Sequence, residues 1–355
     1  MSQLVRPLRV ALDVSALRLG NAGVARLITR LAAAVEARDD VQLLRIGSGA
    51  APAPGTIGRR ALALRLDLAW HLRGARREAA HIGADVLHTP LPRGPLRPGQ
   101  PPTVVTIHDL AVVRYPETLS GWNRRYTTRT LRRMLNAADA IVAVSQDTAA
   151  DIAAFAPSTQ TRITVITNGV ESSWSVPIDG RPTVDGPYVL AVGTAEPRKN
   201  LPRLVEAMQL RRDAGAPERL VLVGADGWGK AALPDRPWLI RLGRVDDHEL
   251  RLLYQHAMAL AIPSLHEGSG LPVLEAFAAG LPVVAAARGA LPETADGAAV
   301  LVNPLDAREI AAGIDQAISR CDELAAAGRI RAEAATWERV AEQYAEVYRS
   351  VVSVL

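Results

Sequence analysis

The chain contains a single cysteine, Cys321, so it can form no internal disulfide and offers no cysteine-rich metal site. Phenylalanine occurs twice, and aromatic residues make up 4% of the 355 positions. Without an aromatic stacking pattern or a recognisable base-reading motif, the sequence gives no support to nucleic-acid binding. Lysine is also scarce, with Lys199 and Lys230 as its two examples. Arginine therefore carries the mild net charge of +4, which suits anionic small molecules or an anionic membrane surface equally well.

Long apolar runs are missing as well. No stretch approaches the roughly twenty apolar residues that a membrane-spanning helix needs. The first residues, MSQLVRPLRVALDVSAL, lack the apolar core of a signal peptide because Arg6, Arg9 and Asp13 interrupt them. We therefore expect a cytoplasmic protein. Two arginine-rich, partly apolar stretches, 59–77 and 122–135, could make a peripheral contact with an anionic membrane, although such stretches more often form a solvated face.

The remaining composition favours a globular α/β protein. Hydrophobic residues make up 48% of the chain and charged residues 22%, which is ample material for the cores of two domains. Short β-branched runs alternate with longer helical patterns, and this alternation is typical of parallel sheets covered by helices on both faces. The expected strands lie at 8–15, 41–47, 85–89, 102–109, 140–145, 162–170, 188–194, 219–225, 238–245, 259–264, 282–286 and 298–303.

The segment between residues 170 and 190 interrupts the alternation. Prolines and glycines crowd it, and it has no sustained hydrophobic period, as is typical of a linker. In each half of the chain, the first strand leads into a glycine-bearing turn and then a helical pattern, so the same order begins twice. We therefore predict two doubly wound domains, residues 1–178 and 187–335, with a cleft at their strand ends, where open α/β sheets bind ligands.

The stretch HEGSGLPVLEAFAAGLPVV, residues 266–284, joins a small-residue turn to a helix. Pro272 suits the first turn of that helix, and Gly280 suits its C-terminal cap. The turn lets backbone N–H groups approach a ligand closely, and the helix start favours negative charge, so the place suits phosphate. Glu267 and Glu275 would repel phosphate unless each binds a neutral part of the same ligand. Carboxylates accept strong hydrogen bonds from sugar hydroxyls, and a sugar nucleotide carries hydroxyls on both sides of its pyrophosphate.

The stretch EGSGLPVLE, residues 267–275, resembles the Glu-x7-Glu signature of retaining glycosyltransferases of family four. Six further stretches fall in that family's order and spacing: TIHDL, VAVSQDTAADI, ITVITNGVE, VGTAEPRKNL, LGRVDDHELRLLYQHA and PVVAA. The resemblance covers nearly the whole chain. It implies the GT-B fold of two Rossmann-like domains, an N-terminal acceptor-binding domain (1–178) rejoined by the C-terminal helix (336–355), and a C-terminal nucleotide-sugar-binding domain (187–335).

The resemblance also assigns roles to the residues of the turn. Glu275 would bind the ribose hydroxyls of the nucleotide, and Glu267 would contact the transferred sugar close to its anomeric centre. Four residues would hold the donor beside them: Gly268, Ser269, Gly270 and Leu271. Taken alone, Glu267 would be interpreted as a solvated loop acid and Glu275 as an exposed helix residue.

The stretch GTAEPRKN contains a second candidate site. Gly193 ends a strand, and Arg198 and Lys199 follow just before a helix, where two cations can clamp the phosphates of a leaving nucleoside diphosphate. The resemblance gives this role to the same basic residues, principally to Lys199. In a common version of the family motif an arginine directly follows the glycine. Here Thr194 stands in that place, with Arg198 as the expected substitute. The alternative is a basic surface loop without a ligand.

His108 leaves the apolar strand PTVVTIHDL at its C-terminal end, so we expect it to point into the cleft and hydrogen-bond a hydroxyl. The resemblance has this histidine contact the donor sugar, and the alternative is a structural histidine. Asp109 could cap the turn that follows just as well as contact an acceptor. Gly20 and Gly23 lie where the first strand meets the first helix, without the spacing of a dinucleotide fingerprint. In the family, the matching loop lies beside the donor phosphates and the acceptor. Gly23 is therefore the stronger candidate for donor binding, and the alternative is that both glycines only form a turn.

Together these features predict a retaining glycosyltransferase that needs no metal, because side-chain cations and backbone donors would stabilise the leaving diphosphate and no Asp-x-Asp pair is present. The EPRKN form is similar to that of mannosyl- and rhamnosyl-type transferases, which makes GDP-mannose the first expected donor. UDP-glucose and UDP-N-acetylglucosamine are alternatives. The expected acceptor is a hydroxyl of a glycan, a lipid-linked sugar or a small natural product. Two rival interpretations are a GT-B-shaped epimerase or phosphorylase and a non-catalytic protein that binds sugar nucleotides.

Overall fold

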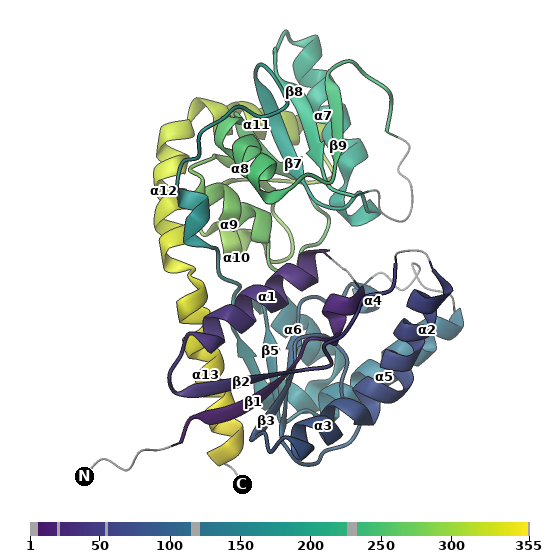
Figure 1. Ribbon diagram of the computed structural model, residues 1–355. Helices are drawn as coiled ribbons and strands as arrows, with labels where there is room; N and C mark the ends of the chain where they lie inside the picture. The colour runs from purple at the N-terminus through teal and green to yellow at the C-terminus, as the bar shows by residue number, and fades with distance from the viewer. Residues whose placement is uncertain (1–5, 20–21, 54–55, 115–120, 226–232, 354–355) are drawn as a thin grey trace, which may run out of the picture. The chain divides into compact units, whose positions relative to one another are not determined.

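The computed structural model describes residues 6–19, 22–53, 56–114, 121–225 and 233–353 of the chain (Figure 1). The chain forms two compact units. The first comprises residues 1–168 together with 337–355, and the second comprises residues 169–336. Every helix in the described part of the chain is too short or too polar to cross a lipid bilayer.

The first unit is built around one parallel sheet with the strand order β2-β1-β3-β4-β5-β6. The strands are β1 (Leu8–Asp13), β2 (Val41–Ile46), β3 (Val86–Thr89), β4 (Thr103–Ile107), β5 (Ala140–Ala143) and β6 (Ile163–Val165). The helices are η1 (Ser15–Leu19), α1 (Ala22–Glu36), α2 (Ile57–Arg65), the π-helix η2 (Leu66–Gly74), α3 (Ala75–His81), α4 (Ala111–Arg114), α5 (Gly121–Ala137), α6 (Gln146–Phe155), η4 (Pro157–Arg162) and α13 (Trp337–Ser353).

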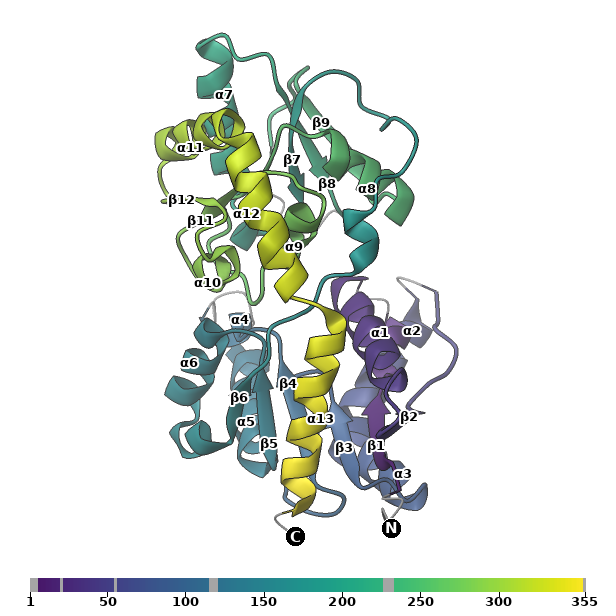
Figure 2. The same cartoon turned by 90° about the vertical axis from the view of Figure 1, so that its left-hand side faces the viewer.

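Successive side chains of each strand point to opposite faces of this sheet, and helices cover both faces. On β1, Val10 packs in a cluster with residues of α1 and α13, whereas its neighbour Ala11 packs with residues of α3. The apolar stripe of α13 supplies Trp337, Val340 and Tyr344 to the first of these clusters. Figure 2 shows α13 lying along the strands of this unit. The last helix therefore belongs to the core of the first unit.

A buried chain of hydrogen bonds also fixes α13 on the sheet. Tyr348 Oη lies 2.8 Å from His88 Nδ1, His88 Nε2 lies 2.9 Å from Thr106 Oγ1, and Thr106 Oγ1 lies 2.8 Å from Tyr344 Oη. Burial lowers the pKa of His88 to about 3, so its ring stays neutral at physiological pH. Because each of these side chains has a hydrogen-bond partner in the chain, the polar groups specify one position of the helix.

The second unit contains a parallel sheet with the strand order β12-β11-β10-β7-β8-β9. The strands are β7 (Tyr188–Val192), β8 (Arg219–Val223), β9 (Leu239–Gly243), β10 (Ala259–Ile262), β11 (Val283–Ala286) and β12 (Val300–Val302). The helices are η5 (Ser172–Ser175), η6 (Pro197–Lys199), α7 (Leu201–Asp213), α8 (Asp247–His256), α9 (Leu271–Ala278), α10 (Leu291–Ala295), α11 (Ala307–Ser319) and α12 (Cys321–Ala334). The strand order reverses between β7 and β10, which makes their adjacent ends the switch point of a doubly wound sheet.

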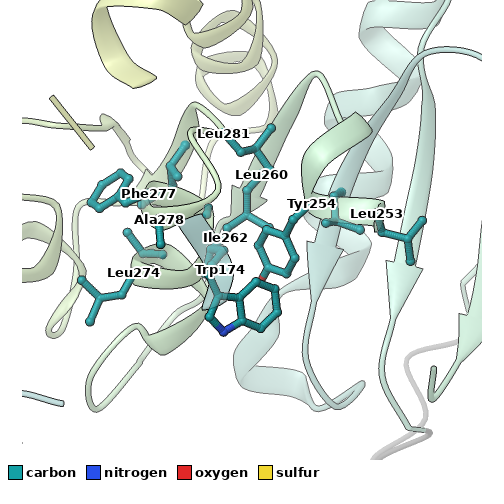
Figure 3. Close-up of a cluster of buried hydrophobic side chains, with 14 of the residues drawn as sticks. Trp174, Leu253, Tyr254, Leu260, Ile262, Leu274, Phe277, Ala278 and Leu281 are labelled. Atoms are coloured by element: carbon teal, nitrogen blue, oxygen red, sulfur yellow. The ribbon is translucent and has the colours of Figure 1, made fainter. Parts of the chain in front are cut away.

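Two hydrophobic clusters cover the faces of this second sheet. Leu190 belongs to a cluster with residues of α8 and α9, and its neighbour Val189 belongs to another with residues of α7 and α11. Figure 3 shows the first cluster, in which Trp174 and Tyr254 pack beside Leu260. The helices therefore hold both sides of the sheet and leave its strand ends for the loops.

The predicted fold class is confirmed, because each of the twelve expected runs contains one of the strands β1 to β12. The compact units differ from the predicted domains where the chain first passes from one unit to the other. There the first compact unit ends at Asn168 and not at residue 178. Val170, Trp174 and Val184 are buried in the core of the second unit, so most of the proline- and glycine-rich segment packs there. Composition alone cannot show on which domain a linker-like segment packs.

Candidate functional site

Two loops lie together at the switch point of the second sheet. One follows β7 and carries residues 193–199, and the other follows β10 and carries residues 263–270. Because β7 and β10 are adjacent and parallel, their carboxyl ends open on the same edge of the sheet. The backbone N–H of Leu265 donates to the carbonyl of Arg198 at 2.7 Å and joins the two loops directly. The predicted sites GTAEPRKN and EGSGLPVLE are therefore one site.

Asn200 holds the first loop in place. Its backbone lies in the left-handed region, with φ 56°, immediately before α7. Its side-chain Nδ2 donates to the carbonyls of Pro263 at 3.0 Å and Pro304 at 2.6 Å. Asparagine adopts left-handed conformations more readily than most residues, which explains this choice at the start of α7. The contact fixes the basic residues of the loop against the end of β10.

The turn before α9 depends on glycine. Gly270 has φ +62°, and a Cβ at this position would lie 3.1 Å from Leu291 Cδ2. Pro272 lies in the first turn of α9, and Gly280, with φ +71°, follows its last turn, as the sequence predicted. Thr294 Oγ1 donates to the carbonyl of Ser269 at 3.0 Å and so supports the turn from α10. These features make α9 begin abruptly, and the first N–H groups of a helix have no acceptor within that helix.

These first N–H groups suit an anion. Within the described ranges, no backbone N–H group of residues 267–271 donates a hydrogen bond to another residue. Gly268 and Gly270 are buried, while Ser269 and Leu271 are half-buried. Several N–H groups at a helix N-terminus, together with the partial positive charge of the helix, form a ready site for phosphate.

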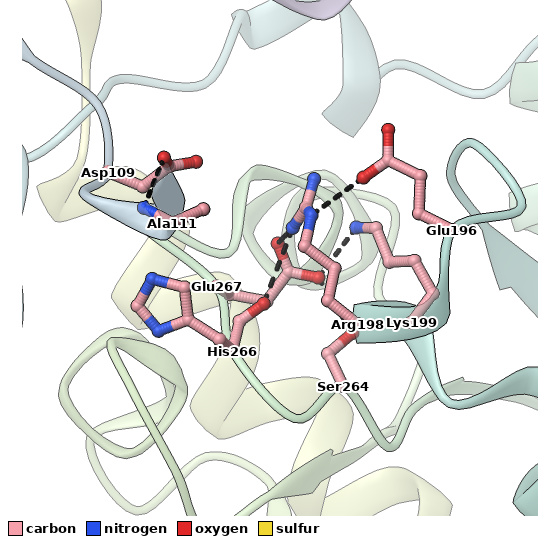
Figure 4. Close-up of polar contacts among 8 residues, drawn as sticks. All are labelled: Asp109, Ala111, Glu196, Arg198, Lys199, Ser264, His266 and Glu267. Atoms are coloured by element: carbon pink, nitrogen blue, oxygen red, sulfur yellow. Dashed lines mark hydrogen bonds and ion pairs between the residues drawn. The ribbon is translucent and has the colours of Figure 1, made fainter. Parts of the chain in front are cut away.

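Glu267 lies at the centre of an ion-pair cluster. Its Oε1 accepts hydrogen bonds from Lys199 Nζ at 2.6 Å and Ser264 Oγ at 2.7 Å, and its Oε2 accepts one from Arg198 NH1 at 3.1 Å. Figure 4 shows the side chains of Lys199 and Arg198 turned toward this carboxylate. Glu267 is 7% exposed, so it is no solvated loop acid. Ser264 was not singled out from the sequence, although its place at the end of β10, three residues before Glu267, could have marked it.

The cluster keeps Glu267 ionised. Burial alone would raise the pKa of this carboxyl, but the charges of Lys199 and Arg198, with the hydrogen bonds from Lys199 and Ser264, lower it to about 2. A carboxylate with this pKa cannot act as a general acid near neutral pH. It can align the two cations and attract positive charge.

The absence of a side chain at Gly193 leaves space for the side chain of Lys199. Gly193 has φ +144°, and a Cβ there would lie 3.0 Å from Lys199 Cε and 3.1 Å from Lys199 Nζ. The side chain of Lys199 is 11% exposed, so it is far more buried than a basic residue in a surface loop. Thr194, which is half-buried, continues the loop. The glycine at this strand end therefore makes room for the ammonium group.

Arg198 also contacts a second acid. Its Nε donates to Glu196 Oε2 at 2.8 Å, a contact that was not predicted from the sequence. The predicted pair of cations is thus a cluster of two cations and two carboxylates, with no net charge. A diphosphate that entered the site would compete with Glu267 and Glu196 for Lys199 and Arg198. Glutamate is common on surfaces, so Glu196 gave no signal of its own in the sequence.

Glu275 lies on the buried side of α9. It is 3% exposed, and its Oε2 accepts a hydrogen bond from Tyr254 Oη at 3.0 Å. The alternative interpretation of an exposed helix residue is therefore wrong. Tyr254 lies in the stretch LGRVDDHELRLLYQHA, but a tyrosine at helical spacing is usually a core residue and so carries no functional signal of its own.

His108 follows β4 in the first unit. Its Nε2 lies 3.0 Å from the carbonyl of Pro90. A carbonyl only accepts, so Nε2 carries the hydrogen and Nδ1 of the neutral ring is an acceptor. Burial lowers the pKa of His108, and Nδ1 has no hydrogen-bond partner among the described residues. This nitrogen can accept a hydrogen bond from a hydroxyl group. The neighbouring Asp109 caps α4, because its Oδ1 accepts from the N–H of Ala111 at 3.0 Å.

Gly23 lies in the first turn of α1 and is exposed, with no atom within 4 Å of the position of a Cβ. Packing therefore does not require glycine at this place. Gly20, the weaker of the two predicted residues, lies outside the described residues.

Two protein-family models match the chain. One, described as "Glycosyltransferase Family 4", matches residues 21–174, and the other, described as "Glycosyl transferases group 1", matches residues 186–320. Among curated proteins, "O-antigen chain mannosyltransferase B" of Escherichia coli is 31% identical over 265 residues. The match covers 69% of this chain and 70% of that protein.

Solved structures with the same fold cover almost the entire chain. Sucrose-phosphate synthase from Thermosynechococcus elongatus superimposes with a TM-score of 0.70 and 21% identity, covering 98% of this chain and 100% of that one. The Anabaena protein Alr3699/HepE, solved in complex with UDP and glucose, gives a TM-score of 0.69 at 16% identity, with 97% and 100% covered. At these identities the likeness extends to the GT-B fold alone.

Proposed function

Because this chain belongs to the family 4 glycosyltransferases and carries a group 1 glycosyltransferase domain in its second unit, we propose that it transfers mannose from GDP-mannose to a hydroxyl group of a glycan or glycolipid, with retention of the anomeric configuration. The observation that carries the proposal is the cluster of Lys199, Arg198 and Glu267 beside the turn 267–271. The cluster provides cations for a diphosphate, and the turn provides backbone donors.

The leaving diphosphate lies against these donors. Lys199 and Arg198 turn from Glu267 to the phosphate oxygens, and N–H groups of the turn 267–271 bind the charge that develops as the glycosidic bond breaks. Donors fixed in advance by the fold stabilise such charge with little reorganisation. The cations take the place of a divalent metal, so the proposed enzyme stays active in EDTA.

The acceptor hydroxyl attacks the anomeric carbon from the face that the diphosphate leaves. The departing phosphate oxygen receives the hydroxyl proton, so no protein base is needed. Glu267 remains ionised and favours the positive charge that builds up on the sugar ring. His108 accepts a hydrogen bond from a sugar hydroxyl through Nδ1. The site therefore works by positioning and electrostatic stabilisation.

The mannosyl donor is supported by the Escherichia coli relative, which is named an O-antigen chain mannosyltransferase. UDP-glucose is the second candidate donor, because a protein of the same fold has been solved with UDP and glucose. The buried carboxylate of Glu275 suits the ribose hydroxyls of either nucleotide.

We propose further that the chain meets a lipid-linked acceptor at the inner face of an anionic membrane. Ile57, Leu64 and Leu68 are 86%, 59% and 52% exposed. Their spacings of seven and four residues bring them to one face of the helical segment formed by α2 and the start of η2. Arg65 is exposed on the same segment. An exposed apolar stripe with a basic residue beside it suits a membrane interface better than water.

Vesicle flotation tests this surface. The chain should bind vesicles that contain phosphatidylglycerol more strongly than vesicles of phosphatidylcholine. The triple change of Ile57, Leu64 and Leu68 to serine should abolish binding and leave donor hydrolysis intact. Equal binding of the variant and the wild type would refute the docking surface.

Release of the nucleoside diphosphate tests the reaction itself. Incubation with GDP-mannose or UDP-glucose and a panel of saccharide and lipid-linked acceptors should liberate GDP or UDP, with slow donor hydrolysis when no acceptor is present. A thermal-shift screen with GDP, UDP and ADP identifies the base, since a ligand that binds the folded state raises the melting temperature. A nucleotide that raises the melting temperature without any turnover would favour a binding protein over an enzyme.

A further inference from the structure

The carboxylate of Glu275 is buried and accepts a hydrogen bond from a buried tyrosine. Glu275 is 3% exposed, and Tyr254 Oη donates to its Oε2 at 3.0 Å. Removing a carboxylate from water is costly unless strong hydrogen bonds replace the lost hydration. The hydroxyl of Tyr254 also lies 3.4 Å from the carbonyl oxygen of Pro272, but its shorter contact is with Glu275, and that contact restricts the rotation of the carboxylate.

The ring of Tyr254 is itself held in place by Trp174. Tyr254 lies on α8, is 1% exposed, and contacts the indole of Trp174 edge to face, with ring centroids 5.1 Å apart. Figure 3 shows Tyr254 directly beside Trp174 in the hydrophobic cluster. The indole Nε1 donates to Glu171 Oε2 at 3.0 Å, so the indole is fixed as well. Trp174 and Glu171 lie in the segment that follows the first compact unit along the chain.

We infer that Tyr254, supported by Trp174, is a positioning residue that sets the carboxylate of Glu275 for the vicinal hydroxyls of a nucleoside ribose. The inference rests on the proposed function, because it concerns the same nucleotide site. A carboxylate binds two neighbouring hydroxyls well only if its two oxygens are correctly aligned, and a freely rotating carboxylate loses part of that affinity on ordering. Tyr254 orders it before the ligand arrives. The segment carrying Trp174 is thereby a structural part of the nucleotide site.

Calorimetric titration of the full chain with ribose-modified nucleotides tests the inference. The ligands are GDP and 2′,3′-dideoxy-GDP, with UDP and 2′,3′-dideoxy-UDP in parallel. Tyr254→Phe removes the hydroxyl and keeps the ring. We expect it to weaken the better-bound diphosphate by about 5- to 10-fold, the effect of one ordinary hydrogen bond, and to leave its dideoxy analogue within about 2-fold of the wild type.

Tyr188→Phe is the matched control. Tyr188 is also 1% exposed, belongs to the same hydrophobic cluster, and donates its hydroxyl to the carbonyl of Leu253 at 2.8 Å. Tyr188→Phe removes this buried hydrogen bond from the core and removes no contact of Glu275. We expect this variant to lower the melting temperature and to bind GDP and dideoxy-GDP with the wild-type ratio of affinities.

Three outcomes separate the inference from the function on which it rests. Equal weakening of the ribo and dideoxy ligands by Tyr254→Phe would show a merely structural role and overturn the inference. If Glu275→Gln lowers the preference for the ribose ligand over its dideoxy analogue and Tyr254→Phe does not, then Tyr254 does not position Glu275. The ribose-binding role of Glu275 is kept in that case. If neither the wild type nor Glu275→Gln discriminates the two ligands, the ribose role of Glu275 fails first. Should Tyr254→Phe not fold, Trp174→Phe must show the same selective loss, in smaller measure.

Discussion

Lys199 Nζ lies 2.6 Å from Glu267 Oε1, and the two side chains are 11% and 9% exposed. An ion pair this well shielded is not a surface pair of little consequence, because loss of one partner leaves the other charged and buried. Both residues come from loops at the switch point of a doubly wound sheet, where ligands bind in such folds. The pair therefore holds a cation ready for an anionic ligand and keeps it neutralised until that ligand arrives.

Lys199→Ala should lower turnover by about 100- to 1,000-fold, the usual effect of removing one donor that stabilises a leaving group. Steady-state release of nucleoside diphosphate measures it. Arg203→Ala is the control, because Arg203 is a half-buried cation of α7 that pairs with Glu206 at 2.7 Å outside the cluster. Wild-type turnover in Lys199→Ala would remove this residue from the reaction.

The ionised state of Glu267 should contribute to stability in a defined pH range. Its pKa of about 2 in the folded chain lies below the usual value of 4.5, so the contribution is complete above pH 4.5 and is lost as the pH falls toward 2. The difference in free energy of unfolding between the wild type and Glu267→Gln should therefore narrow by on the order of 2 kcal/mol between pH 7 and pH 3.

Denaturant titrations at several pH values measure this difference. Glu206→Gln, which removes the exposed partner of Arg203, should show a much smaller change, because solvent screens exposed pairs. A difference between the wild type and Glu267→Gln that is independent of pH would mean that Glu267 is not held ionised by its neighbours.

Gly193→Ala should reduce activity through Lys199. The new Cβ would lie 3.1 Å from Lys199 Nζ and displace the ammonium group, and the residue would keep an unfavourable φ of +144°. Gly215→Ala provides the matched control, because Gly215 has φ +92° with no atom within 4 Å of a Cβ. Both variants should lose about 1–3 kcal/mol of stability, and Gly193→Ala alone should lose turnover. Equal turnover in the two would show that Gly193 does not position Lys199.

His108→Ala should retain donor binding and lose transfer. His108 Nδ1 is an acceptor without a partner among the described residues, so its removal costs the folded chain little at that atom. We expect kcat to fall by about 10- to 100-fold, with the dissociation constant for the nucleoside diphosphate unchanged. His81→Ala, at the exposed end of α3, is the control. Normal transfer would make His108 a structural residue.

Much of the fold was predictable because buried parallel strands are apolar on both faces. Runs such as YVLAVGT and ALAIPS therefore stand out from the helical pattern around them. The limits of the compact units were less predictable. Trp174 and Val184 lie among prolines and glycines, yet their burial ties that segment to the second core. Local composition shows where regular structure stops, but tertiary packing decides where a domain ends.

The site was predictable as far as sequence motifs reach. Glu267 and Lys199 were identified separately, because each belongs to a motif with its own chemistry. Their direct contact depends on β7 and β10 being neighbours, and that strand order is a property of the folded sheet. Glu196 and Tyr254 escaped notice for a related reason. Glu196 is of a residue type that is common on surfaces, and Tyr254 acts on Glu275, which lies 21 positions further along the chain.

The most direct test of the account is a crystal structure of the chain with bound GDP-mannose or UDP-glucose. We predict that the diphosphate oxygens lie within hydrogen-bonding distance of Lys199 Nζ and of backbone N–H groups in the turn 267–271, with the ribose hydroxyls on Glu275. A donor bound elsewhere, with the Lys199–Glu267 pair intact at 2.6 Å, would contradict the account.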